Sequence, residues 1–230
     1  MKVAIIEPDL SSGEYFLNVL NSGKDVFVRR CLVNIAPRVI SNKINPDEQV
    51  AKDFQNAVDD CLVGGENAMV VACNTLQLWL PKIDTKGIKV LTTFDAVDWK
   101  IEQTGLKPMW LGTWPLVEEI AKLGKYVNLL TENREDLQNT LQEIIWRVKA
   151  VEGSDVSGAG LIEMIDSSEE LKIVSLKFFE EIKKMGIEVI VLGCTELPLL
   201  LKKYLDGFDF GEMVVWDPAE LILEKLEAEL

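Results

Sequence analysis

Two stretches decide the fold of this chain: Ala68-Met-Val-Val-Ala-Cys73 and Val189-Ile-Val-Leu-Gly-Cys194. Each is a short, continuous apolar run, which is typical of a parallel strand buried on both faces. Each ends in a cysteine that polar residues follow, Asn74-Thr75 in one case and Thr195-Glu196 in the other. The cysteines therefore fall where a strand gives way to a helix. In α/β sheets, ligands bind at that edge.

Further strand-like runs accompany these two stretches and divide into two series of four. The first series lies at residues 2–6, 26–33, 69–72 and 89–93, and the second at 108–112, 126–130, 188–192 and 213–216. In both series the third run carries the cysteine at its C-terminal end. The order predicts a pseudo-duplicated α/β unit, each copy with a four-stranded, mostly parallel sheet.

Helical patterns separate the strands, as βαβ units require. Two helix starts combine a cap residue, a first-turn proline and an acidic residue, Asn45-Pro46-Asp47-Glu48 and Asp217-Pro218-Ala219-Glu220. The predicted helices cover residues 45–63, 133–151, 168–184 and 217–229. We expect an N-terminal domain over residues 1–97 and a C-terminal domain over 98–216, with the last helix, about 217–230, packing back on the first.

The composition excludes several classes of partner. The chain holds 38 acidic and 24 basic residues, for a net charge of −14, and it has no histidine. This acidic balance argues against nucleic-acid and anionic-membrane partners, which need a basic surface. The N-terminus turns polar after a few apolar residues, which fits a first strand and not a signal peptide, so we expect a cytoplasmic protein. Because histidine, the usual acid or base near neutral pH, is missing, thiols become the leading candidates for proton transfer.

The four cysteines fall into two groups. They form no CxxC pair and have no accompanying histidine, so neither a zinc site nor a disulfide framework is expected. Cys31, inside a predicted strand, and Cys61, on a helix face, are interpreted as small apolar core residues. Cys73 and Cys194 each precede a helix, whose free N–H groups and dipole favour a thiolate. These two are the candidate acid and base.

The two cysteine segments resemble a known pair of motifs. Val71-Ala72-Cys73-Asn74-Thr75 and Leu192-Gly193-Cys194-Thr195-Glu196 are similar to the two signatures of the aspartate/glutamate racemase superfamily, which works without pyridoxal phosphate. The Cys-Thr-Glu form of the second motif resembles the aspartate racemase branch, because glutamate racemases usually have Cys-Thr-His there. Val214-Val215-Trp216-Asp217-Pro218 is similar to the family's last strand and the start of its final helix.

The resemblance implies a fold and a reaction. We expect two pseudo-symmetric, flavodoxin-like domains with the active site in the cleft between them, no cofactor, no metal, and a homodimer. One thiolate would remove the α-proton of an acidic amino acid from one face, and the opposite thiol would deliver a proton to the other. Cys73 and Cys194 are then the catalytic residues. The residues expected to bind the substrate are Ser11, Arg38, Asn74, Thr75, Thr113, Lys149 and Thr195.

Three of these residues rest on looser matches to the family. Arg38 falls near an arginine that holds the substrate's side-chain carboxylate. Lys149, in Trp146-Arg147-Val148-Lys149-Ala150, matches a lysine that does similar work, and both cations suit a dicarboxylate. Thr113 matches the threonine after the first strand of the second domain. The family's next threonine is replaced by Trp114-Pro115-Leu116, which alters that part of the anion cradle.

The largest departure from the family follows the first strand. Aspartate racemases have Gly-Gly-Met there, and this chain has Glu7-Pro8-Asp9-Leu10-Ser11-Ser12-Gly13. Ser11 or Ser12 offers a helix cap and a donor to a carboxylate, whereas Glu7 and Asp9 add negative charge. The alternatives are therefore a related cofactor-independent enzyme, namely a maleate-type isomerase, a decarboxylase or a hydantoin-type racemase, or an inactive carboxylate-binding relative.

Overall fold

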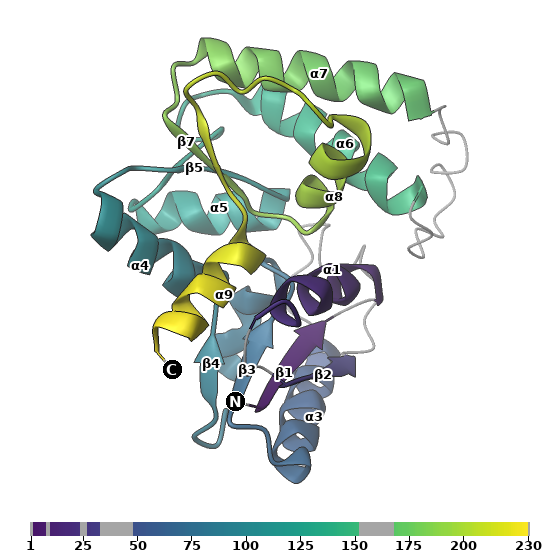
Figure 1. Cartoon of the computed structure of the whole chain (residues 1–230), viewed down its shortest axis with the longest axis vertical. Helices are drawn as coiled ribbons and strands as arrows, with labels where there is room; N and C mark the ends of the chain where they lie inside the picture. The colour runs from purple at the N-terminus through teal and green to yellow at the C-terminus, as the bar shows by residue number, and fades with distance from the viewer. Residues whose placement is uncertain (1, 8–9, 24–26, 33–47, 152–167, 230) are drawn as a thin grey trace. The chain divides into compact units, whose positions relative to one another are not determined.

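The computed structural model describes residues 2–7, 10–23, 27–32, 48–151 and 168–229. The chain separates into two compact units (Figure 1). Unit 1 comprises Met1–Thr104 with Pro218–Leu230, and unit 2 comprises Gly105–Asp217. The described strands form one four-stranded sheet in each unit.

The sheet of unit 1 is entirely parallel, with the order β2-β1-β3-β4. Its strands are β1 (Lys2–Glu7), β2 (Phe27–Leu32), β3 (Ala68–Val71) and β4 (Lys89–Leu91). Its helices are α1 (Leu10–Leu20), α3 (Glu48–Gly64), the short 3₁₀ helix η1 (Leu76–Lys82), α4 (Thr93–Thr104) and α9 (Pro218–Ala228). Residues of β1 and β3 are almost wholly buried because helices cover both faces of the sheet.

The two faces of this sheet carry different side chains, since alternate residues of a strand point to opposite sides. Ala4, Ile6 and Cys31 pack in one apolar cluster with Phe54 and Cys61 of α3. The opposite face packs against α1, which also contacts α9. Unit 1 is thus a three-layer α/β sandwich built on one central sheet.

Unit 2 repeats this order of strands, as β6-β5-β7-β8. The strands are β5 (Met109–Leu111), β6 (Val127–Asn128), β7 (Val189–Leu192) and β8 (Val214–Trp216). The helices are α5 (Trp114–Leu123), α6 (Glu135–Val151), α7 (Ser168–Lys184) and α8 (Glu196–Tyr204). Its core joins residues of β5 and β7 with the inner faces of α6, α7 and α8.

The predicted α/β class with two four-stranded, mostly parallel sheets is confirmed, and the two sheets share one strand order. The predicted helix over 168–184 has those bounds in the structure. The predicted strand over 126–130 is only two residues long in the structure, Val127–Asn128, and Asn128 explains why it ends early. The side-chain oxygen of Asn128 accepts the N–H groups of Leu130 and Thr131 at 2.9 and 3.1 Å, so the backbone turns after two paired residues.

The expected boundary after residue 97 falls inside helix α4. This helix continues to Thr104 and packs along α9, so residues 98–104 belong to unit 1. Gly105 then adopts a left-handed backbone with φ +71°, which suits the end of a helix and favours glycine.

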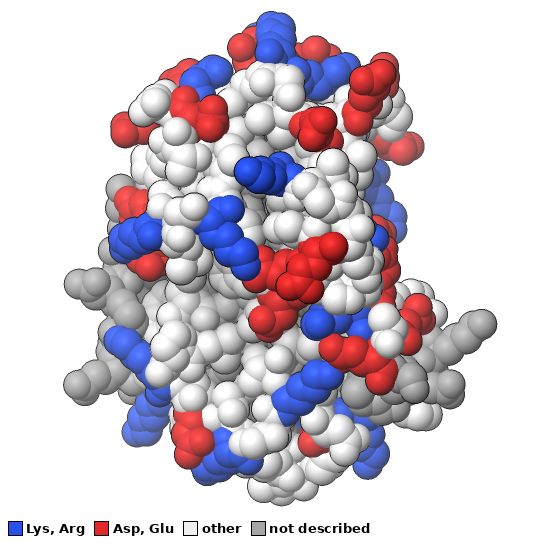
Figure 2. Space-filling model, turned by 90° about the vertical axis from the view of Figure 1, so that its left-hand side faces the viewer, with Lys and Arg blue, Asp and Glu red and all other residues white. Residues whose placement is uncertain are grey.

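Charged side chains form ion pairs along α9 in unit 1. Lys100 of α4 lies 2.6 Å from Glu224 of α9. Lys89 and Lys225 both contact Glu229. Figure 2 shows acidic and basic side chains interspersed on one face of the molecule.

Across the described ranges, every helix is too short or too polar to pass through a bilayer.

Candidate active site

Cys73 lies two residues beyond the end of β3, at the carboxyl edge of the first sheet. The backbone N–H of Ala72 donates to the carbonyl of Ile6 at 2.8 Å, which extends the ladder to the residue before the cysteine. The thiol is partly exposed, and the N–H of Leu76 donates to its sulfur at 3.4 Å. Such a donor stabilises negative charge on the sulfur, so the local structure suits a thiol that gives up its proton.

Asn74 and Thr75 follow this cysteine and are both buried. Gln77 fixes the Asn74 side chain, because its amide nitrogen donates to Asn74 Oδ1 at 3.3 Å and to the Val71 carbonyl at 3.2 Å. The Gln77 oxygen in turn accepts from the N–H and hydroxyl of Thr93, at 3.1 and 3.0 Å. Sequence inspection missed Gln77, since its partners Val71 and Thr93 are distant in the chain. The network holds Asn74 in one orientation beside Cys73.

Cys194 occupies the equivalent place in unit 2, two residues beyond the end of β7 and just before α8. It is buried, and its thiol donates to Glu196 Oε2 over 2.6 Å. The Thr195 hydroxyl donates to the same carboxylate oxygen at 3.2 Å. This cysteine therefore has a carboxylate positioned to accept its proton.

Lys149, at the end of α6, completes a three-residue chain with Glu196 and Cys194. Its ammonium nitrogen lies 3.2 Å from Glu196 Oε1, and the two side chains are 9% and 4% exposed. Burying a carboxylate without a partner would cost several kcal/mol. The ion pair with Lys149 therefore stabilises the charged form of Glu196 beside the Cys194 thiol. Lys149 was expected to hold a substrate carboxylate, and the structure places it on Glu196. Glu196 itself was seen in the motif but not expected in the site.

Two glycines bring the carboxyl ends of β5 and β7 together. The N–H of Gly193 donates to the Leu111 carbonyl at 2.6 Å. A Cβ atom on Gly193 would lie 2.7 Å from that oxygen, and one on Gly112 would lie 3.1 Å from the Gly193 oxygen. Because neither position has room for a side chain, the backbones that lead to Thr113 and Cys194 run side by side.

Thr113 is buried and is the N-terminal cap residue of α5, with an extended backbone but no side-chain capping bond. The N–H of Trp114 donates instead to Gln142 Oε1 of α6 at 2.9 Å. Gln138, one turn earlier on α6, donates to the Gly112 carbonyl at 2.8 Å. After the altered sequence that follows Thr113, Gln142 accepts the Trp114 N–H at the start of this helix, so that N–H is already hydrogen-bonded within the protein.

Glu7 ends β1 at the same edge of the first sheet as Cys73, and its charge is compensated. It is 1% exposed, and Arg30 of β2 binds both of its oxygens, at 2.6 and 2.9 Å. A fork-to-fork contact of this kind is among the stronger ion pairs of proteins. The negative charge that Glu7 adds after the first strand is therefore neutralised from β2. Sequence inspection missed Arg30.

Two predicted site residues remain, Ser11 and Arg38. Ser11 lies in the first turn of α1. Arg38 lies outside the described residues. Within the described ranges, no cluster of three or more cysteine, aspartate or glutamate residues could hold a metal ion. Unit 1 therefore brings Cys73 together with Asn74 and Thr75, and unit 2 brings Cys194 together with Thr195 and Lys149.

Comparisons with known proteins give structural neighbours only. No protein-family model matches the chain, and no curated protein matches it either. Among solved structures, it is similar to the aspartate racemase of Picrophilus torridus, with a TM-score of 0.68 and 15% identity over 99% of this chain and 93% of that one. For an aspartate racemase homologue from Pyrococcus horikoshii OT3, the TM-score is 0.62 and the identity 22%, over 99% of this chain and 98% of that one. For the glutamate racemase of Francisella tularensis, solved with D-glutamate, the TM-score is 0.61 and the identity 15%, over 100% of this chain and 80% of that one.

These neighbours are structures of the superfamily that the two cysteine motifs resemble. At identities of 15–22% they establish the fold and leave the substrate to be inferred from the site. The chain has the two-unit α/β fold of the aspartate and glutamate racemases.

Proposed function

We propose that the chain is a cofactor-independent racemase of aspartate or glutamate, with Cys73 and Cys194 as acid and base on opposite faces of the α-carbon. The observation that carries the proposal is the equivalence of the two thiols. Each lies two residues after the third strand of a sheet, and both sheets have the same strand order. Inversion needs one proton acceptor and one proton donor on opposite sides of the carbon, and two equivalent thiols on two equivalent units meet that need.

The surroundings of the two thiols differ, and this difference suggests how a turnover starts. Glu196, charged and paired with Lys149, can take the proton of Cys194. The resulting thiolate would remove the α-proton from one enantiomer, while the Cys73 thiol delivers a proton from the other side. For the opposite enantiomer the roles exchange, with the Leu76 N–H stabilising the Cys73 thiolate. In this scheme Lys149 acts through Glu196 as a positioning residue.

Deprotonation beside a carboxylate creates an enolate-like dianion that the site must stabilise. The Thr75 hydroxyl and the Asn74 amide, next to Cys73 in the chain, are proposed as donors. The Thr195 hydroxyl, next to Cys194, is proposed as a further donor that turns from Glu196 to the substrate. We retain Arg38 as the proposed partner of the side-chain carboxylate. An acidic substrate also agrees with the names of the structural neighbours, which are aspartate and glutamate racemases. A homodimer remains part of the proposal.

The test is exchange of the α-hydrogen with solvent. Each enantiomer of aspartate and glutamate is incubated with the enzyme in D₂O, and loss of the α-proton signal is followed by NMR alongside chiral analysis. We expect deuterium in the product enantiomer, and loss of racemisation in Cys73→Ser and in Cys194→Ser. Cys61→Ala, which alters a thiol outside the site, is the matched control and should remain active. Full activity in either serine variant would refute the two-thiol mechanism, as would absence of exchange with all four substrates.

A further inference from the structure

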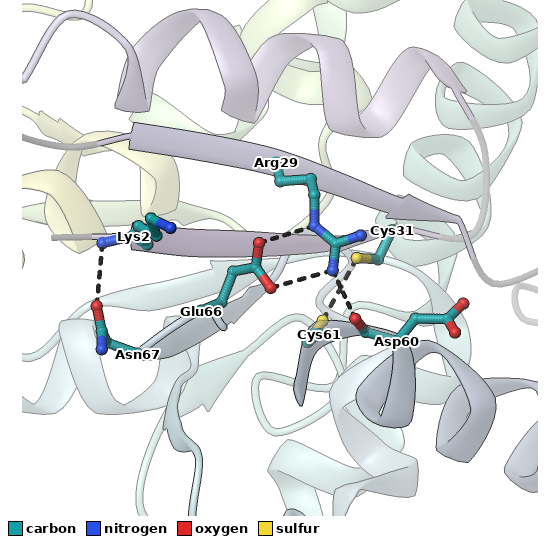
Figure 3. Close-up of polar contacts among 7 residues, drawn as sticks. All are labelled: Lys2, Arg29, Cys31, Asp60, Cys61, Glu66 and Asn67. Atoms are coloured by element: carbon teal, nitrogen blue, oxygen red, sulfur yellow. Dashed lines mark hydrogen bonds and ion pairs between the residues drawn. The ribbon is translucent and has the colours of Figure 1, made fainter. Parts of the chain in front are cut away.

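The other two cysteines contact each other in the core of unit 1. Cys31 lies on β2 and Cys61 on α3, and the Cys61 thiol donates to the Cys31 sulfur at 3.4 Å (Figure 3). The side chains are 6% and 0% exposed. Both residues are expected from the sequence to be apolar core residues, and both do belong to the apolar cluster between α3 and the sheet. An apolar role alone does not require their sulfurs to meet.

Among the charged groups around the pair, Arg29 favours a thiolate on Cys31, whereas Glu66 and Asp60 oppose it. Arg29 lies two residues earlier on β2 and so faces the same side of the sheet (Figure 3). Its guanidinium binds both oxygens of Glu66, at 2.8 and 3.0 Å, and the carbonyl of Asp60 at 2.7 Å. These bonds hold the cation on the α3 side of β2, beside the two sulfurs.

The two thiols have opposite tendencies as a result. The hydrogen bond from Cys61 lowers the pKa of Cys31 below its ordinary value, and the positive charge of Arg29 acts in the same direction against the effect of burial. The same hydrogen bond, together with burial, raises the pKa of Cys61. One sulfur is therefore prepared as a nucleophile, and its neighbour retains a proton. Reactive cysteine pairs have this asymmetry.

We propose that Cys31 and Cys61 are an oxidation site at which a peroxide forms a reversible disulfide. The Cys31 thiolate attacks one peroxide oxygen, so that an S–O bond forms, the O–O bond breaks, and hydroxide leaves and takes up a proton as water. The Cys61 sulfur then attacks the Cys31 sulfenic acid, so that the S–S bond forms, the S–O bond breaks, and the Cys61 proton leaves with the oxygen as a second water. The peroxide is reduced and each sulfur loses one electron.

The geometry also explains which oxidant fits. Hydrogen peroxide is close to water in size, so it is the oxidant that suits a pair of residues only 6% and 0% exposed. The new bond would tie β2 to α3 and close a ring from residue 31 to residue 61. Closing a ring of this size removes many conformations from the unfolded chain and stabilises unit 1.

The test uses a chain in which only this pair of thiols remains. The Cys73→Ser/Cys194→Ser variant keeps Cys31 and Cys61 out of four cysteines. After hydrogen peroxide, we expect the intact mass to fall by two hydrogen atoms, alkylation in denaturant to find no thiol, and peptide mapping to link Cys31 to Cys61. Reductant should restore both thiols. We expect the melting temperature of the oxidised chain to be higher by about 5–15 °C.

Matched variants decide between this mechanism and general oxidation. With Cys61→Ala added to the test chain, peroxide should leave a sulfenic acid on Cys31 that dimedone traps, with no loss of hydrogen. Arg29→Gln should slow the formation of the link, because fewer Cys31 thiolates remain. The proposal is overturned if the test chain gains oxygen without a link, if the link joins two molecules, or if the oxidised chain melts at or below the temperature of the reduced one. Thiols that resist peroxide in the folded chain but react in the unfolded one would overturn it as well.

Discussion

Replacing Glu196 by glutamine should destabilise unit 2 because it removes one partner of the buried ion pair with Lys149. The two side chains are 9% and 4% exposed, with 3.2 Å between nitrogen and oxygen. At an effective dielectric constant of about 20, two unit charges at this distance attract by about 5 kcal/mol. Removing one partner of such a buried pair costs about 3–5 kcal/mol. We therefore expect Glu196→Gln, and separately Lys149→Met, each to lower the free energy of unfolding by that amount.

The double variant distinguishes a buried ion pair from two independent contacts. Lys149→Met/Glu196→Gln leaves no unpaired charge, so its loss should be smaller than the sum of the single losses by about 1–3 kcal/mol. Urea unfolding followed by tryptophan fluorescence gives the free energies. If a single variant does not fold, recovery of folding in the double variant gives the same information.

A surface pair in the same unit serves as the control for this cycle. Lys184 and Glu181 lie 2.6 Å apart, but their side chains are 68% and 43% exposed. Lys184→Met and Glu181→Gln should each change the stability by less than about 1 kcal/mol. The reasoning is refuted if the Lys149 and Glu196 losses add within about 0.5 kcal/mol, or if the buried and exposed pairs behave alike.

Three further predictions follow from the structure. Gly193→Ala should lower stability by about 1–3 kcal/mol in urea unfolding, since its Cβ would lie 2.7 Å from the Leu111 oxygen; an unchanged midpoint would show that the backbone can yield there. Glu7→Gln should cost about 1.5–3 kcal/mol by loss of a charged, bidentate contact with Arg30, and Asp59→Asn, whose partner Lys86 is exposed, should cost less than about 1 kcal/mol; equal losses would contradict the argument from burial. Under reducing conditions, the stability difference between the parent chain and Cys31→Ala/Cys61→Ala should rise with pH up to about 8.5 and fall above it. The lowered pKa of Cys31 makes the unfolded chain bind more protons below that pH, and the raised pKa of Cys61 makes the folded chain bind more above it; a difference that is constant with pH would disprove these shifts.

The features of the fold that depend on local sequence could be predicted. The apolar runs that end at Val71 and Leu192 mark the two central strands, because only a strand covered on both faces is apolar throughout. The positions of Cys73 and Cys194 at the carboxyl edges of the sheets could be predicted from the ends of these strands. The helix from Ser168 to Lys184 was predicted because a capping serine and a stop glycine bound its apolar stripe.

The contacts between distant segments could not be predicted. Gln142 looks like any polar residue of a helix, and only the packing of α6 beside α5 reveals that it binds the Trp114 N–H. Arg30 resembles a solvent-facing residue of an edge strand, and its carboxylate partner, Glu7, lies on the neighbouring strand. The contact between Cys31 and Cys61 likewise depends on how α3 crosses the sheet, and two residues 30 positions apart in the sequence give no sign of it.

Helix α9 has a consequence for the order in which the chain can fold. It buries Leu221, Ile222 and Leu226 against unit 1, chiefly along α4, although the whole of unit 2 separates it from that partner in the sequence. During synthesis, residues 105–217 leave the ribosome as one continuous unit that can fold as it emerges. The strands of unit 1 are synthesised early, but α4 is not covered by α9 until residues 218–228 have been made. The nascent chain should therefore expose the face of α4 that α9 covers for as long as unit 2 is being made.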